Sequence, residues 1–222
     1  MNQRLKHYVA LADIFDYPDE NFSTKVLEIR SFLLKYAPIG AEAFLPFVEV
    51  ITNLGLLDQQ ELFIRSFDVQ SLTTLDLGYV LFGDDYKRGE LLVNLNREHR
   101  EVDNDCGHEL ADYLPNVLRL LPKLQDDSLQ LEFVEKILAP ALVAMTAAFD
   151  KDRIVEKEKF YQKKYKTIID RPVDQYTVYQ RALKTLYIVL RQDFNFHVPE
   201  STEKTSDFLK NIGTEILLEE NK

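Results

Sequence analysis

The segment "ELADYLPNVLRLL" runs from Glu109 to Leu121 and predicts a buried helix with an acidic start. Its apolar residues recur at intervals of three and four, which is the period of an amphipathic helix. Asp112 is expected to cap this helix, and Pro115 falls in the first turn, where a missing N–H costs least. The expected buried stripe consists of Leu114, Val117, Leu118 and Leu121.

A second acidic helix start lies upstream in "GDDYKRGELLVNLNREH", from Gly83 to His99. Asp84 or Asp85 is expected to cap it, because a carboxylate stabilises the positive end of the helix dipole. Gly89 inside the helix costs about 1 kcal/mol relative to Ala. Gly89 therefore predicts that another backbone approaches this helix closely. If the two acidic helix starts pack together in this way, their carboxylates form one acidic rim.

The rest of the chain has the same helical period, and glycine is rare, with seven among 222 residues. We therefore predict an all-α protein. Expected helices cover 5–15, 22–36, 41–54 with Pro46 near its start, 56–67, a segment from 71 with Ser71 as its cap, and 128–150 with a kink at Pro140.

The character of the sequence changes near residue 150, where the highly charged "DKDRIVEKEKFYQKKYK" begins. We predict a single helical-bundle domain over residues 1–150 and a variable helical C-terminal extension over residues 151–222. That extension contains the amphipathic "DQYTVYQRALKTLYIVLRQ", then a linker-like segment over 193–207, then a short terminal helix. Whether it packs on the core or moves is left open by the sequence.

Composition excludes several classes of function. The net charge of −10 disfavours nucleic-acid binding, because the surface repels phosphate backbones. No apolar run is long enough to span a membrane, and the N-terminus does not read as a signal peptide. The single Cys106 fits a reducing cytoplasm, and the Cys and His spacings predict no metal site.

The sequence contains little that predicts catalysis. Neither a Walker-type phosphate loop nor a nucleophile elbow occurs. His99 and His108 lie near acidic residues and could serve proton transfer, but no nucleophile or metal pattern accompanies them. Cys106, in a polar loop, is an isolated thiol. We therefore predict a protein that is not an enzyme and has no cofactor.

Four segments together resemble a known family. "ELADYLPNVLRLL" resembles the E-[LP]-x-D-[HY]-L-P motif of the TorD/DmsD/NarJ family of redox-enzyme maturation chaperones, and the NarJ branch looks closest. "LADIFDYPDE", "LDQQELFIRSFDV" and "GDDYKRGELLVNL" resemble further segments of that branch, in the same order, over about residues 5–150. Ala111 departs from a frequent Pro and Tyr113 from a frequent His, which puts in doubt any role for a titrating imidazole there.

The resemblance implies a cytoplasmic, all-helical chaperone for a molybdopterin-dependent oxidoreductase such as nitrate reductase. Such proteins bind the N-terminal segment of the catalytic subunit, often a twin-arginine-like leader, and hold it for molybdenum cofactor insertion and assembly. An apolar helix next to basic residues requires an apolar groove with an acidic rim. We expect that groove to involve Tyr79, Phe82, Asp84, Asp85, Tyr86, Arg88, Glu109, Asp112, Tyr113, Leu114 and Pro115.

Other interpretations stay open at this point. Asp112 fits a helix cap as well as a peptide contact, Arg88 fits an internal ion pair, and Leu114 fits the core. Reversing Asp112 and Glu109 to Lys is expected to weaken peptide binding without loss of helicity. The whole chain also fits a helical adaptor without a metalloenzyme client. The sequence does not name the client, decide between monomer and dimer, or decide whether a guanine nucleotide or cofactor precursor binds.

Overall fold

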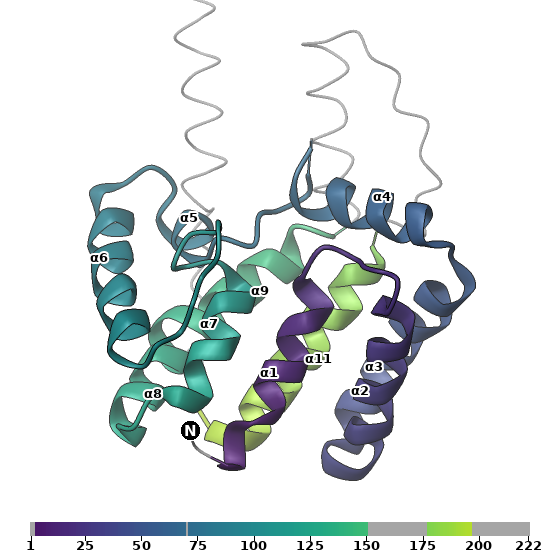
Figure 1. Cartoon of the computed structure of the whole chain (residues 1–222), viewed down its shortest axis with the longest axis horizontal. Coiled ribbons are helices and arrows are strands. Elements are labelled where there is room, and N and C mark those ends of the chain that lie inside the picture. Colours follow the sequence, from purple (N-terminus) through teal and green to yellow (C-terminus); the bar gives the residue numbers. More distant parts are fainter. Residues whose placement is uncertain (1–2, 70, 151–176, 197–222) are drawn as a thin grey trace, which may run out of the picture.

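A computed structural model describes residues 3–69, 71–150 and 177–196 of the chain. These residues form helices joined by turns and loops, as predicted for an all-α protein (Figure 1). Within the described ranges, the pairing of extended backbone is limited to an isolated antiparallel bridge between Asp76 and Tyr113. This bridge lies at the contact that organises the candidate site below.

The helices follow one another in a simple order. They are α1 (His7–Ala12), α2 (Phe22–Tyr36), α3 (Pro38–Asn53), α4 (Leu56–Phe67), α5 (Leu77–Phe82), α6 (Tyr86–Glu101), α7 (Leu114–Leu120), α8 (Asp127–Phe133), α9 (Ala139–Ala147) and α11 (Val178–Phe194). Short 3₁₀ turns occupy Gln3–Leu5, Asp13–Phe15 and Leu121–Lys123, and a π-helical turn covers Val134–Leu138.

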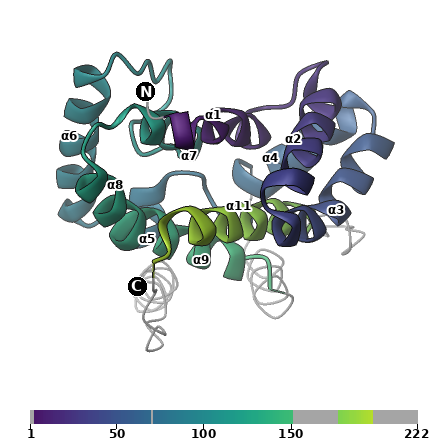
Figure 2. The same cartoon turned by 90° about the horizontal axis from the view of Figure 1, so that it is seen from below.

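The bundle is organised around α11, which packs mainly on α3 and α9, while α1 packs on α7. In Figure 1 the helices α2, α3 and α4 lie to the right of α1, and α5 to α8 lie to its left. Figure 2 shows α1 and α11 in different layers of the bundle. The N-terminal helix therefore lies between two groups of helices that are both anchored on the layer beneath it.

Aromatic rings fill the centre where α3, α4 and α11 meet. The buried ring of Tyr179 on α11 makes edge contacts with Phe47, Phe63 and Phe67, with centroids 4.8–5.9 Å apart. Such edge-to-face pairs add about 0.5–1.5 kcal/mol each beyond the burial of apolar area. Because α11 supplies Tyr179, this helix completes the core that begins with α3 and α4.

Several predicted helices are confirmed, one of them with the expected bounds, 22–36. The helix expected over 56–67 is confirmed as α4. The third helix begins at Pro38, earlier than predicted, because proline is well suited to the first helical position. Pro46 therefore lies inside the helix, and its predicted place near the start is wrong. The predicted cap at Ser71 is wrong, since α5 begins only at Leu77 and its N-cap is Asp76.

The helix predicted over 128–150 corresponds to α8, a π-helical turn and α9 in succession, and the predicted kink at Pro140 stays a prediction. The π-helical turn Val134–Leu138 lies directly before α9, which has Pro140 in its first turn. Proline has no N–H to donate to the preceding turn, and its ring crowds the carbonyl there, so the helix widens locally. The sequence did not predict this turn.

The amphipathic segment of the predicted extension shares the same core. Buried α11 side chains include Val178, Tyr179, Ala182, Leu183, Leu186, Val189 and Leu190. The division of the chain near residue 150 stays a prediction, but 178–194 packs against the helices of residues 1–150. The charged segment 151–176 and the expected terminal helix lie outside the described residues.

The end of α11 is tied to the N-terminus through one carboxylate. The side chain of Asp193 is 3% exposed and accepts hydrogen bonds from Tyr8 Oη at 2.8 Å and Tyr36 Oη at 2.5 Å. His7 Nε2 lies 2.8 Å from the same carboxylate. Burial raises the pKa of Asp193, but the hydrogen bonds from His7, Tyr36 and Tyr8 more than offset it, so this pKa is lowered.

Close packing occurs at Gly78 rather than at Gly89. A Cβ atom at Gly78 would lie 2.8 Å from Asp112 Oδ2 and 3.1 Å from Arg88 Cγ, whereas a Cβ atom at Gly89 meets nothing within 4 Å. The prediction of a close backbone approach at Gly89 is therefore wrong. Gly89 lies on the exposed side of α6, and the neighbour of the tight contact is instead the side chain of Asp112.

We expect replacement of Asp193 by Asn to lower the free energy of unfolding by about 2–3 kcal/mol at pH 7, because charge-assisted hydrogen bonds are lost. Urea denaturation checks this value. Asp68→Asn, at an exposed position, is the matched control and should change it by less than about 0.5 kcal/mol. Equal effects of the two replacements would contradict the role of Asp193.

The stability difference between the wild type and Asp193→Asn should also depend on pH. Because the pKa of Asp193 is lowered below 3.8 in the folded state, its stabilisation is complete above that ordinary value and disappears as pH falls through the folded pKa. The stability difference between wild type and Asp193→Asn should therefore shrink from pH 5 to pH 3. A difference that grows over this range would exclude the proposed electrostatics.

The two glycines form a second matched pair. Gly78→Ala should lower the free energy of unfolding by about 1–3 kcal/mol, since the new methyl group overlaps a buried carboxylate. Gly89→Ala, in open space on a helix, should raise it by up to about 1 kcal/mol. Thermal or urea unfolding of both variants measures the contrast, and the same sign for both would refute this packing.

Candidate functional site

The four segments quoted above lie in contact with one another, although they are far apart in the sequence. The loop that follows α1 touches both α4 and α7, and the loop before α7 touches α5 and α6. The contacts are mostly polar and are buried or half-buried. Four segments that are separate in the sequence are therefore linked into one connected region, which includes both exposed and buried residues.

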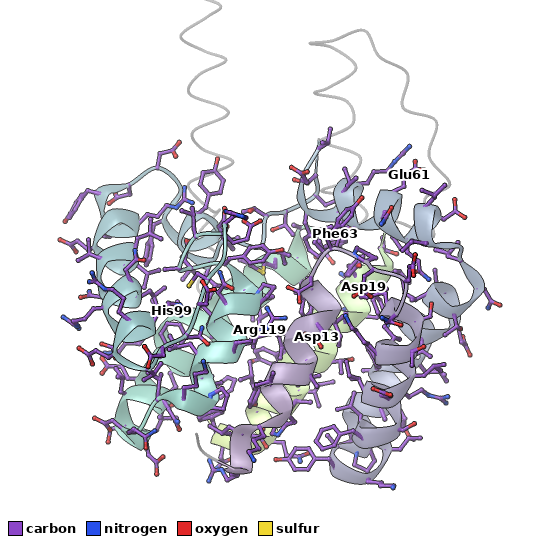
Figure 3. All side chains as sticks on the ribbon, viewed as in Figure 1. Asp13, Asp19, Glu61, Phe63, His99 and Arg119 are labelled. Atoms are coloured by element: carbon purple, nitrogen blue, oxygen red, sulfur yellow. The ribbon has the colours of Figure 1, made fainter. Side chains whose placement is uncertain are left out.

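Arg119 on α7 joins its helix to the turn after α1. Its guanidinium is 2.8 Å from Asp13 Oδ1 and also binds Asp16. Figure 3 shows Arg119 and Asp13 next to each other on neighbouring helices. Tyr113 Oη donates to the backbone oxygen of Phe15 at 3.2 Å. The start and the last turn of α7 are thus both fixed to the "LADIFDYPDE" segment.

The same segment is held on its other side by α4. Gln60 Nε2 donates to the backbone oxygen of Pro18 at 2.9 Å, and the ring of Tyr17 packs edge-on against Phe63 at 5.7 Å. Figure 3 places Phe63 and Asp19 in this region above α1. The turn after α1 therefore bridges the two groups of helices.

Arg88 on α6 is an internal partner, as one of the two interpretations expected. Its guanidinium lies 3.6 Å from Asp76 and 3.8 Å from Asp112, and 5.1 Å from the centre of the Tyr79 ring. The arginine side chain is 21% exposed. It therefore links α5, α6 and the loop before α7, while part of its surface stays open to solvent.

Asp112 caps a helix, but not the one that was predicted. The N-cap of α7 is Tyr113, and Asp112 Oδ2 instead accepts from Gly78 N at 3.0 Å, in the first turn of α5. The Asp112 backbone oxygen accepts from Leu77 N at 3.0 Å. The loop before α7 thus supplies acceptors to the N-terminus of a helix more than thirty residues upstream, which sequence spacing does not reveal.

The electrostatic environment of Asp112 is unusual. The carboxylate is fully buried, and its Oδ1 has no hydrogen-bond partner within the part of the chain that the structure describes. Burial, followed by the negative charge of Asp76, raises the pKa of Asp112, and the Gly78 N–H and Arg88 oppose this rise. A lysine at position 112 would be buried against Gly78, so the reversal that seemed harmless from the sequence is expected to disrupt this contact.

The residues predicted to form a peptide site divide into three groups by exposure. The exposed residues are Asp84, Asp85, Tyr86 and Glu109. The half-buried residues are Tyr79, Phe82, Arg88 and Tyr113. The buried residues are Asp112, Leu114 and Pro115. The last group presents no side chain to solvent and supports the others from below. Asp85 is also the N-cap of α6, where it accepts from Lys87 N, as one of the two candidate caps.

Hydrogen bonds from His99, Asn104 and Asn116 fix the loop between α6 and α7, and the sequence did not predict this role for them. His99 Nε2 lies 3.0 Å from the Ala111 oxygen, which can only accept, so Nε2 carries the hydrogen and Nδ1 accepts from Asn104. Burial lowers the pKa of His99, which agrees with a neutral ring. Asn116 donates to the Cys106 and Leu110 oxygens. His99 is thus held in a structural role.

A groove of about 350 Å³ lies between α1 and α2, outside the residues predicted from the sequence. It is lined by Lys6, His7, Ala10, Leu11, Asp13, Lys25, Glu28, Ile29 and Phe32. Leu11 and Ile29 are buried at its base, while Phe32 is 37% exposed. Sequence reasoning missed it because a groove between two helices depends on how far apart they pack.

No group of three or more His, Cys, Asp or Glu side chains suited to a metal ion occurs among residues 3–69, 71–150 and 177–196. Across the same ranges, none of the helices is long and apolar enough to cross a membrane.

Comparison with known proteins shows a similarity that covers part of the chain. The chain is 31% identical over 116 residues to the Escherichia coli (strain K12) protein described as "Probable nitrate reductase molybdenum cofactor assembly chaperone NarW". The match covers 51% of this chain and about half, 48%, of the relative. The sequence matches none of the family models searched. The similarity thus covers about half of each protein, and it is a similarity to a protein described as a nitrate reductase assembly chaperone.

Proposed function

We propose that this protein is a cytoplasmic chaperone for the catalytic subunit of a molybdopterin-dependent oxidoreductase, nitrate reductase or a relative of it. It binds the N-terminal segment of that subunit and holds it while the molybdenum cofactor is inserted and the enzyme assembles. The description of the Escherichia coli relative supports this proposal, as do the sequence segments that resemble the family. The protein itself carries out no reaction in this account.

The observation that carries the proposal is the contact between the four segments that resemble the family. Arg119, Tyr113 and Gln60 connect them through the turn after α1, and Arg88 and Asp112 connect the remaining pair. Their arrangement supports a common binding surface rather than a set of isolated helix ends.

The proposed peptide surface lies around the starts of α6 and α7. Asp84 and Glu109 supply exposed negative charge, and Tyr86 supplies an exposed ring, 72% accessible. A leader segment that combines basic residues with an apolar helix needs both kinds of contact. Beneath them Asp112, Leu114 and Pro115 would hold the geometry without touching the peptide.

A charge-reversal experiment tests this surface. Asp84→Lys combined with Glu109→Lys should weaken binding of a basic leader peptide of the client by about tenfold, or about 1.4 kcal/mol, because attraction becomes repulsion. Glu42→Lys with Glu49→Lys, at exposed positions of α3, changes the net charge equally and is the matched control. Isothermal titration calorimetry at two salt concentrations measures both variants, and circular dichroism checks the helicity.

Equal losses in the two variants would mean that total charge, rather than this surface, governs binding. Unchanged affinity in both would remove Asp84 and Glu109 from the site. If the wild-type chain binds no leader from any molybdopterin oxidoreductase of its host, the adaptor interpretation replaces the chaperone proposal.

A further inference from the structure

Helix α6 lies at the edge of the bundle in both Figure 1 and Figure 2. Its buried residues, Leu95 and His99, lie on the side of the helix that faces the core. On the opposite side, Tyr86 is 72% exposed and Val93 is 69% exposed. Within the part of the chain that the structure describes, the outer face of α6 therefore leaves two large apolar side chains open to solvent.

This outer face forms one continuous stripe along α6. Its members recur at intervals of four and three and fall within about 60° of one another at 100° per residue: Tyr86, Glu90, Val93 and Arg97. Gly89 lies beside the stripe, where a Cβ atom would meet nothing within 4 Å. Glycine is less favourable than alanine inside a helix. The open space beside Tyr86 and Val93 is therefore available to the side chains of another molecule.

The charges on the outer face of α6 complement a second copy of the same helix. In an antiparallel pair with its two-fold axis beside Val93, the numbers of facing residues add up to about 187. Glu90 then faces the partner's Arg97, and Lys87 faces the partner's Glu101. Because the two-fold axis repeats every contact, both attractive contacts occur twice in each dimer.

The other charges at the two ends of α6 fit the same arrangement. Arg100 is exposed and lies level with the partner's Tyr86 and Gly89, so its guanidinium can cover the exposed ring. The two aspartates that precede α6 lie level with the partner's Arg100 and Asp103, and so meet one charge of each sign. The antiparallel pair therefore leaves no row of like charges along the contact.

Arg97 also has contacts within its own helix, with Glu98 at 3.2 Å and with Glu101 at 4.0 Å. The side chains of Arg97 and Glu101 are 58% and 62% exposed. Exposed ion pairs of this kind contribute little to stability, so they can rearrange when a second helix arrives.

Charge favours both this face and the antiparallel direction. Helix α6 carries four Lys or Arg residues and three Glu residues, a balance of +1, whereas the whole chain has a net charge of −10. Repulsion between two acidic chains is therefore small at this helix. A parallel pair would instead place Glu90 against Glu90 and Arg97 against Arg97, and like charges in contact disfavour that pairing.

We propose that two copies of this chain associate through the outer faces of α6, in antiparallel orientation. The contact is one pair of helices with two apolar residues from each copy, which is small for a stable dimer. The dimer is therefore weak and reversible, with a dissociation constant of about 10–100 µM. Tyr86 also belongs to the proposed peptide surface, so the dimer covers part of that surface. This last consequence rests on the proposed function, whereas the dimer itself does not.

Charge reversal with rescue tests the proposal, with the dissociation constant of the full chain measured by analytical ultracentrifugation. Glu90→Lys alone and Arg97→Glu alone should each weaken the dimer at least about tenfold, because each places like charges opposite each other twice. The double variant should return to within about threefold of the wild type, because the pairs form again with their signs exchanged. Circular dichroism checks that each variant keeps its helices.

Lys35→Glu and Glu49→Lys, at exposed positions of α2 and α3, are the matched controls and should change the dissociation constant by less than about twofold. Disulfide formation between copies gives a second readout in a Cys106→Ser background. Val93→Cys, beside the two-fold axis, should form the linked dimer at least about tenfold faster than Glu49→Cys, because association raises the effective concentration of its partner.

A chain that stays monomeric up to about 1 mM would overturn the proposal. So would single reversals that act no more strongly than the controls, a double variant that is as weak as the singles, or equal rates for the two cysteine variants. Addition of a basic leader peptide tests the consequence separately. Dissociation of the dimer supports shared use of Tyr86, and a dimer that persists with the leader bound contradicts it. If no leader binds, the proposed function fails while the dimer stands.

Discussion

The contact of the Asp112 carboxylate with the amide of Gly78 is the constraint on which the candidate site depends. It buries a charge-bearing group completely, and it requires a residue without Cβ at position 78. Such burial is costly unless the group is bonded, and here the N-terminal turn of α5 and the Arg88 guanidinium provide the compensation. The result is that the loop before α7, α5 and α6 keep a fixed relationship, and the exposed residues around them have defined positions.

A second polar tie sets the position of the N-terminal helix. The Asp193 carboxylate contacts the side chains of His7, Tyr8 and Tyr36. The last turn of α11 therefore fixes the start of α1 and the end of α2. Arg119 then fixes the other end of α1 to α7. Between these ties the groove beside α2 stays open. These polar ties, together with the apolar core, fix the positions of α1, α2, α7 and α11 relative to one another.

Much of the fold could be predicted from the sequence, since helical period and proline positions are local signals. The bounds of α2 follow directly from them. The partner of Asp112 could not be predicted, because a cap supplied across more than thirty residues leaves no spacing in the chain. The assignment of close packing to Gly89 failed for the same reason: both glycines look alike in sequence, and only the neighbours distinguish them. The sequence also named candidate residues for a peptide site. It could not tell that the side chain of Asp84 is exposed and that of Leu114 is buried, because exposure depends on tertiary packing.

The central claim is that this chain handles the catalytic subunit of a molybdenum enzyme before that enzyme is complete. The most direct measurement is purification of the full chain from its own host, with the proteins that accompany it identified by mass spectrometry and their molybdenum content determined. The account predicts a molybdopterin oxidoreductase catalytic subunit that lacks its molybdenum, bound with its N-terminal segment protected from proteolysis. Recovery of only unrelated partners, together with fully loaded molybdenum enzymes in cells that lack the gene, would contradict it.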